Sequence, residues 1–149
     1  MKSAPHAFLG LAFAGLSLFA SSRATAETAP NAAAPKVSVI VSGTKLVDGK
    51  ATINFGTIKL GNSSKPKTFT IKNIGNAKLP NLDVLASGKQ RSSFDGSRPK
   101  LKNLAPGQST TFTGFFKPKV VGTNNVVIHV TNGFDTTTFD IKLTGVGKN

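Results

Sequence analysis

The chain has 149 residues, of which 38% are hydrophobic and 17% are charged. This length allows one domain, and this balance is typical of a soluble globular protein rather than of a disordered chain. Because there is no cysteine, disulfides, thiolate metal sites and thiol nucleophiles are excluded. Phenylalanine occurs 11 times while tryptophan and tyrosine are absent, so the aromatic residues suit a core better than a platform for stacking bases or sugars.

The formal net charge of +13 favours anionic partners such as nucleic acid, an acidic polysaccharide or an anionic membrane surface. The lysines are scattered along the chain and never form a run of four. We therefore favour the simpler explanation, that the charge keeps the protein soluble and monomeric, and keep the binding of an anion as the alternative.

Residues 1–26 have the three parts of a cleavable secretory signal peptide. Lys2 supplies the positive start, residues 7–20 are apolar, and Ala24-Thr25-Ala26 gives the small-x-small cleavage pattern. The apolar run is too short to cross about 30 Å of hydrocarbon comfortably, and no second hydrophobic segment follows it. We expect cleavage after Ala26 and a mature protein without a transmembrane segment, in a periplasm or outside the cell.

Residues 27–36 (ETAPNAAAPK) are rich in alanine and proline, which predicts a flexible lead-in to a single domain at 37–147. The first segments of that domain have strand patterns. Residues 37–41 carry β-branched residues at alternate positions, and residues 51–58 alternate until Gly56, which predicts a bulge.

Residues 67–74 alternate apolar and polar side chains, and one wet face is typical of an antiparallel sheet. Residues 79–85 form a further predicted strand, which Pro80 places at an edge. Residues 86–100 are polar and are predicted to be irregular.

Residues 104–122 (LAPGQSTTFTGFFKPKVVG) hold the densest pattern. Pro106-Gly107 fits a type II turn, in which glycine takes the position with positive φ. Phe112 and Phe116 share one face of the strand that follows, and Pro118 ends this strand because it has no N–H to donate.

The remaining segments, at 126–131 and 138–143, are strands by their alternation, with a hairpin signal at Asn132-Gly133 between them. No stretch of ten or more residues after Glu27 has the 3.6-residue period of a helix. Seven or eight short antiparallel strands with turn signals between them predict an all-β, immunoglobulin-like Greek-key sandwich.

A set of short motifs runs through nearly the whole predicted domain. They are Asn54-Phe55-Gly56, Gly61, residues 69–73, residues 75–77, Leu79, Phe94, residues 104–108, residues 116–118, Gly122 and residues 143–147. In this order they resemble the ASH/Hydin-like domains, immunoglobulin-like sandwiches related to the major sperm protein fold. The resemblance implies a module for protein contacts, with no catalytic residues and no cofactor. We expect the chain to differ from such modules in being a single domain with its own signal peptide rather than part of an array.

The residues themselves supply no catalytic or metal-binding set. His129 is the one histidine after the predicted cleavage site, and Asp140 would have to neighbour it to act as a catalytic orienter, so we expect a solvated or cross-strand-paired histidine. The acidic residues are well separated, and the chain has no G-x-S-x-G elbow and no D-x-D loop. We therefore predict no catalytic residue, no metal, no cofactor and no enzyme.

Two candidate surfaces remain. Phe115 and Val127 are apolar on faces expected to point outward, so together they would form a surface for a partner or a second copy. The alternative is that a bulge turns them inward or that the lead-in covers them. A basic patch would form if the loops at 61–66, 86–103 and 117–122 met at one end, and it would lack the aromatic residues needed to recognise bases. Its members are Lys65, Lys67, Lys100, Lys102, Lys117 and Lys119.

Three functions follow from these observations. The leading hypothesis is a secreted or periplasmic, non-enzymatic module that contacts an unknown protein, at the cell surface. The alternative is electrostatic binding of an anionic polymer or envelope surface by the basic loops. A third, ranked last, is a periplasmic assembly chaperone that lends an edge strand, because one domain leaves no room for the two-domain cleft that such a role would use.

Overall fold

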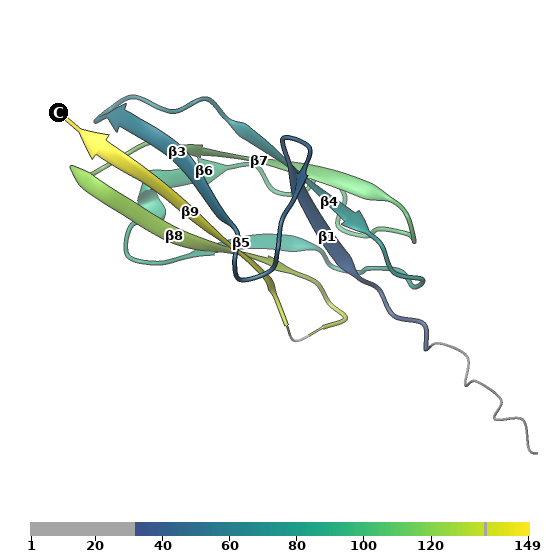
Figure 1. Ribbon diagram of the computed structural model, residues 1–149. Helices are drawn as coiled ribbons and strands as arrows, with labels where there is room; N and C mark the ends of the chain where they lie inside the picture. The colour runs from purple at the N-terminus through teal and green to yellow at the C-terminus, as the bar shows by residue number, and fades with distance from the viewer. Residues whose placement is uncertain (1–31, 136) are drawn as a thin grey trace, which may run out of the picture. The chain divides into compact units, whose positions relative to one another are not determined.

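The computed structural model describes residues 32–135 and 137–149 and shows a sandwich of two β-sheets (Figure 1). The expected signal peptide and the first part of the lead-in lie outside these residues. The elements in chain order are β1 (Val37–Val41), β2 (Thr44–Lys45), β3 (Thr52–Lys59), β4 (Lys67–Asn73), β5 (Asp83–Ser87), the 3-10 helix η1 (Arg91–Ser93), β6 (Phe94–Gly96), β7 (Ser109–Phe116), β8 (Gly122–Thr131) and β9 (Phe139–Lys148).

The first sheet has the strand order β2-β1-β4-β7-β6, and the second has the order β3-β9-β8-β5. The predicted immunoglobulin-like sandwich is confirmed, with nine strands in the described part of the chain rather than seven or eight. The two shortest strands, β2 and β6, have two and three residues, which is too short for an alternating pattern to predict them.

One strand pair corrects the expectation that all strands are antiparallel. After β2 the chain leaves the first sheet and crosses to the second, where β3 pairs with β9 in the parallel direction. The β3–β9 register shifts between Asn54 and Thr57, and Gly56 has a φ of 80°, so the predicted bulge is present. Glycine tolerates this left-handed conformation because it has no Cβ.

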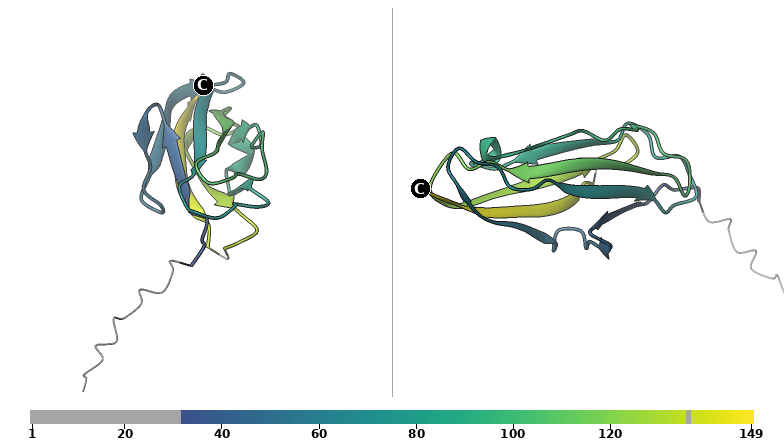
Figure 2. Two further views of the ribbon diagram at one scale, coloured as in Figure 1. Left: turned by 90° about the vertical axis from the view of Figure 1, so that its right-hand side faces the viewer. Right: turned by 90° about the horizontal axis from the view of Figure 1, so that it is seen from above.

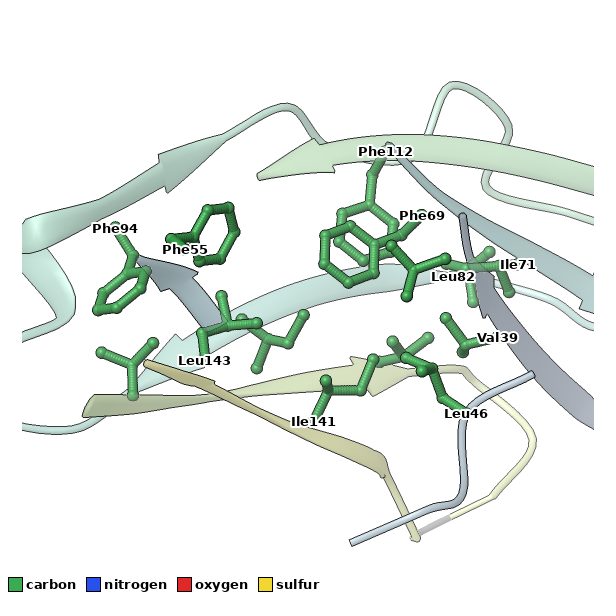
Figure 3. Close-up of a cluster of buried hydrophobic side chains, with 14 of the residues drawn as sticks. Val39, Leu46, Phe55, Phe69, Ile71, Leu82, Phe94, Phe112, Ile141 and Leu143 are labelled. Atoms are coloured by element: carbon green, nitrogen blue, oxygen red, sulfur yellow. The ribbon is translucent and has the colours of Figure 1, made fainter. Parts of the chain in front are cut away.

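Phenylalanine and aliphatic side chains from both sheets fill the space between them (Figure 3). Phe69 of β4 and Phe112 of β7 stack with their ring centroids 4.7 Å apart. Phe94 extends this aromatic row, with centroids 4.9 Å from Phe116 and 5.9 Å from Phe55. Along β7 buried and half-buried residues alternate from Thr110 to the end of the strand, which confirms the predicted inward face.

The region between β4 and β7 differs most from expectation. Within the predicted strand at 79–85, Leu79 makes only an isolated bridge to Leu104, and β5 begins at Asp83. The delay has a local cause, because Pro80 cannot donate a ladder hydrogen bond and Asn81 has a φ of 49°. The segment at 86–100, expected to be irregular, contains η1 and β6.

The lead-in joins the fold earlier than expected. The Ala34 amide donates to the Asn76 side chain at 2.8 Å, and the Ile74 amide donates to the Lys36 carbonyl at 2.7 Å. Pro35 between them is buried. Residues 34–36 are therefore part of the domain, because they supply backbone partners to the turn that follows β4.

Candidate functional site

Phe115 and Val127 lie on outer faces of the sandwich, as their alternation predicted, but they do not share one. Phe115 is in β7 of the first sheet and faces Asp95 of β6, whereas Val127 is in β8 of the second sheet and faces Lys142 of β9. The outer faces of two packed sheets point away from each other, so these two side chains do not form a common surface. Both are half-buried by their neighbours.

The end of the sandwich at which β9 finishes is marked by the C-terminus in Figure 2. Four of the six predicted basic-patch lysines belong to the segments that meet there, which are the loop after β3, the start of β4 and the loop after β7. The loop at 61–66 meets the end of β7 through a hydrogen bond from the Ser64 amide to the Phe116 carbonyl, and the amide of Lys117 donates to the carbonyl of Ser93, the last residue of η1. These two contacts bring together the segments that carry Lys65, Lys67, Lys117 and Lys119. Lys100 and Lys102 belong to the opposite end, because the segment after β6 runs back along β7: the Lys100 amide donates to the Thr111 carbonyl, and the Lys102 carbonyl accepts the Leu82 amide.

A chain of hydrogen bonds joins three strands on the outer face of the second sheet. Ser87 Oγ of β5 lies 2.7 Å from His129 Nε2, and His129 Nδ1 lies 2.7 Å from Asp140 Oδ1. The hydroxyl of Thr138 also donates to this carboxylate. That hydrogen bond lowers the pKa of Asp140, burial opposes it by raising the pKa, and the contact with His129 adds to the lowering, so the net pKa lies below the usual value.

Serine, histidine and aspartate in this order match the groups of a nucleophilic triad. Asp140 does lie beside His129, as a catalytic orienter would have to. The surroundings differ from those of such a site. The Asp140 side chain is 36% exposed, and backbone N–H groups of β8 and β9 lie in the plane of the sheet, where they pair with neighbouring strands. They therefore do not point at an oxyanion formed above Ser87. We interpret the three side chains as a cross-strand link.

Among the residues that the structure places, no three histidine, aspartate or glutamate side chains come together as metal ligands. In that same part of the chain, no helix has both the length and the apolar character needed to cross a membrane.

The open side of the sandwich, between the edge strands β5 and β6, holds a cleft of about 300 Å³. We call it the β5–β6 cleft. Its floor is made by core side chains of both sheets, and its rim is polar on the β6 side and mostly apolar on the β5 side. The floor includes Phe69, Phe94, Phe112, Ile128 and Leu143, and the rim includes Asp95, Ser97 and Arg98. Core aromatic side chains thus come close to solvent on this side.

Two features make the rim of the β5–β6 cleft accessible to a partner. Strand β5 pairs with β8 on one side and ends its sheet on the other, which leaves a row of backbone N–H and C=O groups open. Leu85, in the middle of β5, is 48% exposed. An apolar side chain beside an open strand edge is suited to pairing with an extended segment of another protein.

An ion pair crosses the rim of the cleft. Arg98 Nη1, from the segment after β6, lies 2.6 Å from Asp83 Oδ1 at the start of β5. Burial alone raises the pKa of Asp83, but the hydrogen bonds from Arg98 and from the Val84 amide outweigh it and hold the pKa below its usual value. The pair ties the two sheets together at one end of the cleft.

Sequence reasoning missed both the cleft and Leu85. Leu85 was placed at the end of a predicted strand, and β6 was not expected, so the two edges could not be set opposite each other. The weak signal was Pro80, which did place that strand at an edge. The triad-like link was missed because strand order is needed to bring Ser87 beside His129.

The family described as HYDIN/CFA65/VesB-like, Ig-like domain matches residues 46–145. The chain belongs to this family. Its members are generally protein-interaction modules and are typically not catalytic. No curated protein matches the chain by sequence.

Solved structures share the fold at low sequence identity. The ASH/PapD-like domain 7 of human CEP192 matches with a TM-score of 0.51 and 14% identity, over 97% of this chain and 99% of that domain. A family 123 glycoside hydrolase from Clostridium perfringens matches with a TM-score of 0.50 and 11% identity, over 66% of this chain and 23% of the hydrolase. The secreted serine protease VesC from Vibrio cholerae matches with a TM-score of 0.46 and 20% identity, over 63% of this chain and 21% of the protease. The chain thus spans about a fifth of the length of these two enzymes, whereas it corresponds to nearly the whole CEP192 domain.

Proposed function

We propose that the protein is a secreted or periplasmic, non-enzymatic module that binds another protein through the open edge of β5 and the β5–β6 cleft. The observation that carries the proposal is the exposed Leu85 on an unpaired strand edge, beside a cleft floored by core phenylalanines. Membership in a family of interaction modules supports it. The signal-peptide pattern of residues 1–26 supports export.

An added strand would gain backbone hydrogen bonds from β5, and one of its apolar side chains would enter the cleft. Open strand edges otherwise tend to pair nonspecifically, and native proteins usually cover or charge them. Strand β5 begins with a charged residue, Asp83, but Val84, Leu85, Ala86 and Ser87 carry no charge. This uncharged stretch is the part of the edge that we assign to the partner.

The test is site-specific crosslinking in the producing cell with the full-length chain. A photoreactive side chain at Leu85 should give a discrete crosslinked product, whereas one at Val47, which is equally apolar and 59% exposed, should not. The substitution Leu85→Arg should reduce co-purification of the same protein by at least about tenfold, because a charge would enter an apolar contact. Equal crosslinking from both positions, or binding unaffected by Leu85→Arg, would remove β5 as the binding site.

The non-enzymatic part of the proposal has a separate test. Purified protein should hydrolyse activated esters no faster than a Ser87→Ala variant does. Turnover that disappears with Ser87→Ala or His129→Gln would overturn it, because both substitutions break the one nucleophile-like arrangement found among the described residues.

A second candidate function is electrostatic binding of an anionic polymer or surface. It is favoured by a specific observation, the meeting of Lys65, Lys67, Lys117 and Lys119 at one end of the sandwich. Binding of this kind weakens steeply with salt, so affinity that stays constant between low and high salt would exclude it.

A further inference from the structure

The end of the sandwich at which β9 finishes is built from four segments that are far apart in sequence. The Ser64 amide donates to the Phe116 carbonyl at 2.8 Å, the Lys117 amide to the Ser93 carbonyl at 2.8 Å, and the Leu60 amide to the Lys148 carbonyl at 2.8 Å. We call this surface the basic end and define it as residues 59–66, 88–93, 117–121 and Lys148.

The side chains of the basic end that carry a charge are all cationic. Its cationic residues are Lys59, Lys65, Lys89, Arg91, Lys117, Lys119 and Lys148, and none of its segments contains aspartate or glutamate. Lys67 adds a further ammonium group beside it, 5.7 Å from the centre of the Phe55 ring. More than a third of the chain's 19 lysines and arginines thus lie in these segments, and the acidic residue nearest to them in sequence is Asp95 of β6. Clustered charges of one sign raise the local electrostatic potential.

Apolar side chains project from the same surface. Val120 and Val121, directly after Lys119, are 50% and 56% exposed, and Leu60, directly after Lys59, is 38% exposed. Val120 and Leu60 are therefore each adjacent in sequence to a lysine, and Val121 is one residue further along. Solubility alone gives no reason to expose apolar residues in the middle of a cationic surface.

Buried polar groups hold the loop that carries the two valines. Ser93, 1% exposed, accepts the Lys117 amide on its carbonyl and the Lys119 amide on its hydroxyl at 3.2 Å. Asn124, fully buried, donates from its amide nitrogen to the Val120 and Gly122 carbonyls at 3.3 and 2.8 Å. Pro118 is also buried. The loop is thus presented in one conformation, with its two lysines and two valines on the surface.

We propose that the basic end docks on an anionic lipid surface, with Val120, Val121 and Leu60 entering the boundary between headgroups and acyl chains and the lysines contacting lipid phosphates. This proposal rests on the second candidate function above and names its ligand. Charge complementarity selects an anionic surface. The exposed valines select lipid over a soluble polyanion, because only a bilayer offers an apolar phase directly beneath its charged groups.

The test uses purified protein and lipid vesicles of phosphatidylcholine with and without phosphatidylglycerol, in sedimentation at about 0.15 M salt, where the Debye length is about 8 Å. We expect binding to the anionic vesicles only. The variant Lys117→Gln/Lys119→Gln should weaken it by about thirtyfold, from roughly fivefold per lysine near an anionic surface. The variant Val120→Ser/Val121→Ser should weaken it by about tenfold, because two partly exposed side chains no longer leave water.

Matched controls separate a local surface from overall charge. Lys100→Gln/Lys102→Gln removes the same charge from the opposite end and should change binding by no more than about twofold, since these lysines lie beyond the screening length. Val47→Ser removes an apolar side chain that is 59% exposed elsewhere and should have no effect. Unchanged melting curves would show that each variant is folded.

Three results would overturn the proposal. One is the absence of binding to the anionic vesicles. Another is equal weakening by the two lysine double variants, which would mean that only total charge matters. The third is binding to soluble polyphosphate and to vesicles that depends on Lys117 and Lys119 but not on the valines; this would leave the second candidate function intact and exclude lipid insertion. If the parent protein binds neither polyphosphate nor anionic vesicles, the lipid-docking proposal and the second candidate function are both rejected.

Discussion

At the scale of single residues, Asn73 explains why several separate motifs occur together in this chain. Its side-chain nitrogen donates to the carbonyls of Ala77 at 2.7 Å and Leu104 at 3.1 Å, and its side-chain oxygen accepts the amide of Gly75 at 3.0 Å. Its backbone pairs with Gly107 and Gln108. The end of β4, the turn after it and the Pro-Gly turn before β7 are thus tied together at one buried amide.

We predict that Asn73→Ala lowers the free energy of unfolding by about 2–4 kcal/mol, because several buried backbone groups lose their partner and each such loss costs about 1–3 kcal/mol. Urea denaturation of the purified protein measures this. Asn73→Asp keeps the acceptor and loses the two donated hydrogen bonds, so it should also destabilise the protein. A stability loss below about 1 kcal/mol for the alanine variant would show that water replaces these hydrogen bonds.

The sequence could indicate that residues 73–77 and 104–108 were important, since they form part of the family pattern. It could not show that they meet, because only strand pairing brings them together. The same limit applied to Ser87 and His129, which the β5–β8 register places on one face. Patterns along the chain reveal local conformation, whereas contacts between distant residues depend on topology.

At the scale of elements, β7 shows how far alternation can predict structure. The pattern correctly assigned Phe112 to the core and Phe115 to the outer face, because successive side chains of a strand point to opposite sides. It could not tell which sheet each strand joins, and so it wrongly grouped Phe115 with Val127. Short strands such as β6 were not predicted for a different reason, because three residues are too few to show an alternating pattern.

Two phenylalanines on opposite faces of β7 provide a direct test of this assignment. Phe112→Ala should cost about 3–5 kcal/mol of unfolding free energy, because it removes a ring that is 3% exposed and stacked on Phe69 and leaves a cavity. Phe115→Ala should cost about 1 kcal/mol or less, since its side chain keeps contact with water in the folded state. Chemical denaturation of both variants, with equal m-values, gives the comparison. Similar losses for the two would mean that β7 has no distinct inner face.

At the scale of the whole molecule, the two proposed surfaces belong to different parts of the sandwich. The β5–β6 cleft lies along the open side, while the basic end lies where β9 finishes. The sequence predicted the fold class well, because strand patterns and turn residues are local signals. It placed four of the six lysines of the basic patch correctly and misplaced Lys100 and Lys102, because the direction of the segment that carries them depends on the unexpected β6. It could not predict the cleft, which exists only between the edges of two sheets.

The Asp83–Arg98 ion pair links these two sheets, and it makes stability depend on pH in a defined direction. The pKa of Asp83 is lowered in the folded protein from its usual 3.8. The stabilisation is therefore complete above the unfolded-state pKa and is lost as the pH falls through the folded-state pKa. Because Arg98 is 65% exposed, we expect Asp83→Asn to cost no more than about 1 kcal/mol near neutral pH.

The difference in unfolding free energy between the parent protein and Asp83→Asn should stay constant from about pH 5 to pH 8 and shrink below pH 4, as the parent binds the proton that the variant cannot. Denaturation curves at several pH values measure it. Arg98→Gln provides the control, since a double-mutant cycle isolates the pair from the hydrogen bond that Asp83 accepts from Val84. In the Arg98→Gln background, Asp83→Asn should have a smaller effect at neutral pH. A difference that grows on acidification would mean that burial, rather than Arg98, dominates the carboxylate, and the ion pair would then not hold the two sheets together across the cleft.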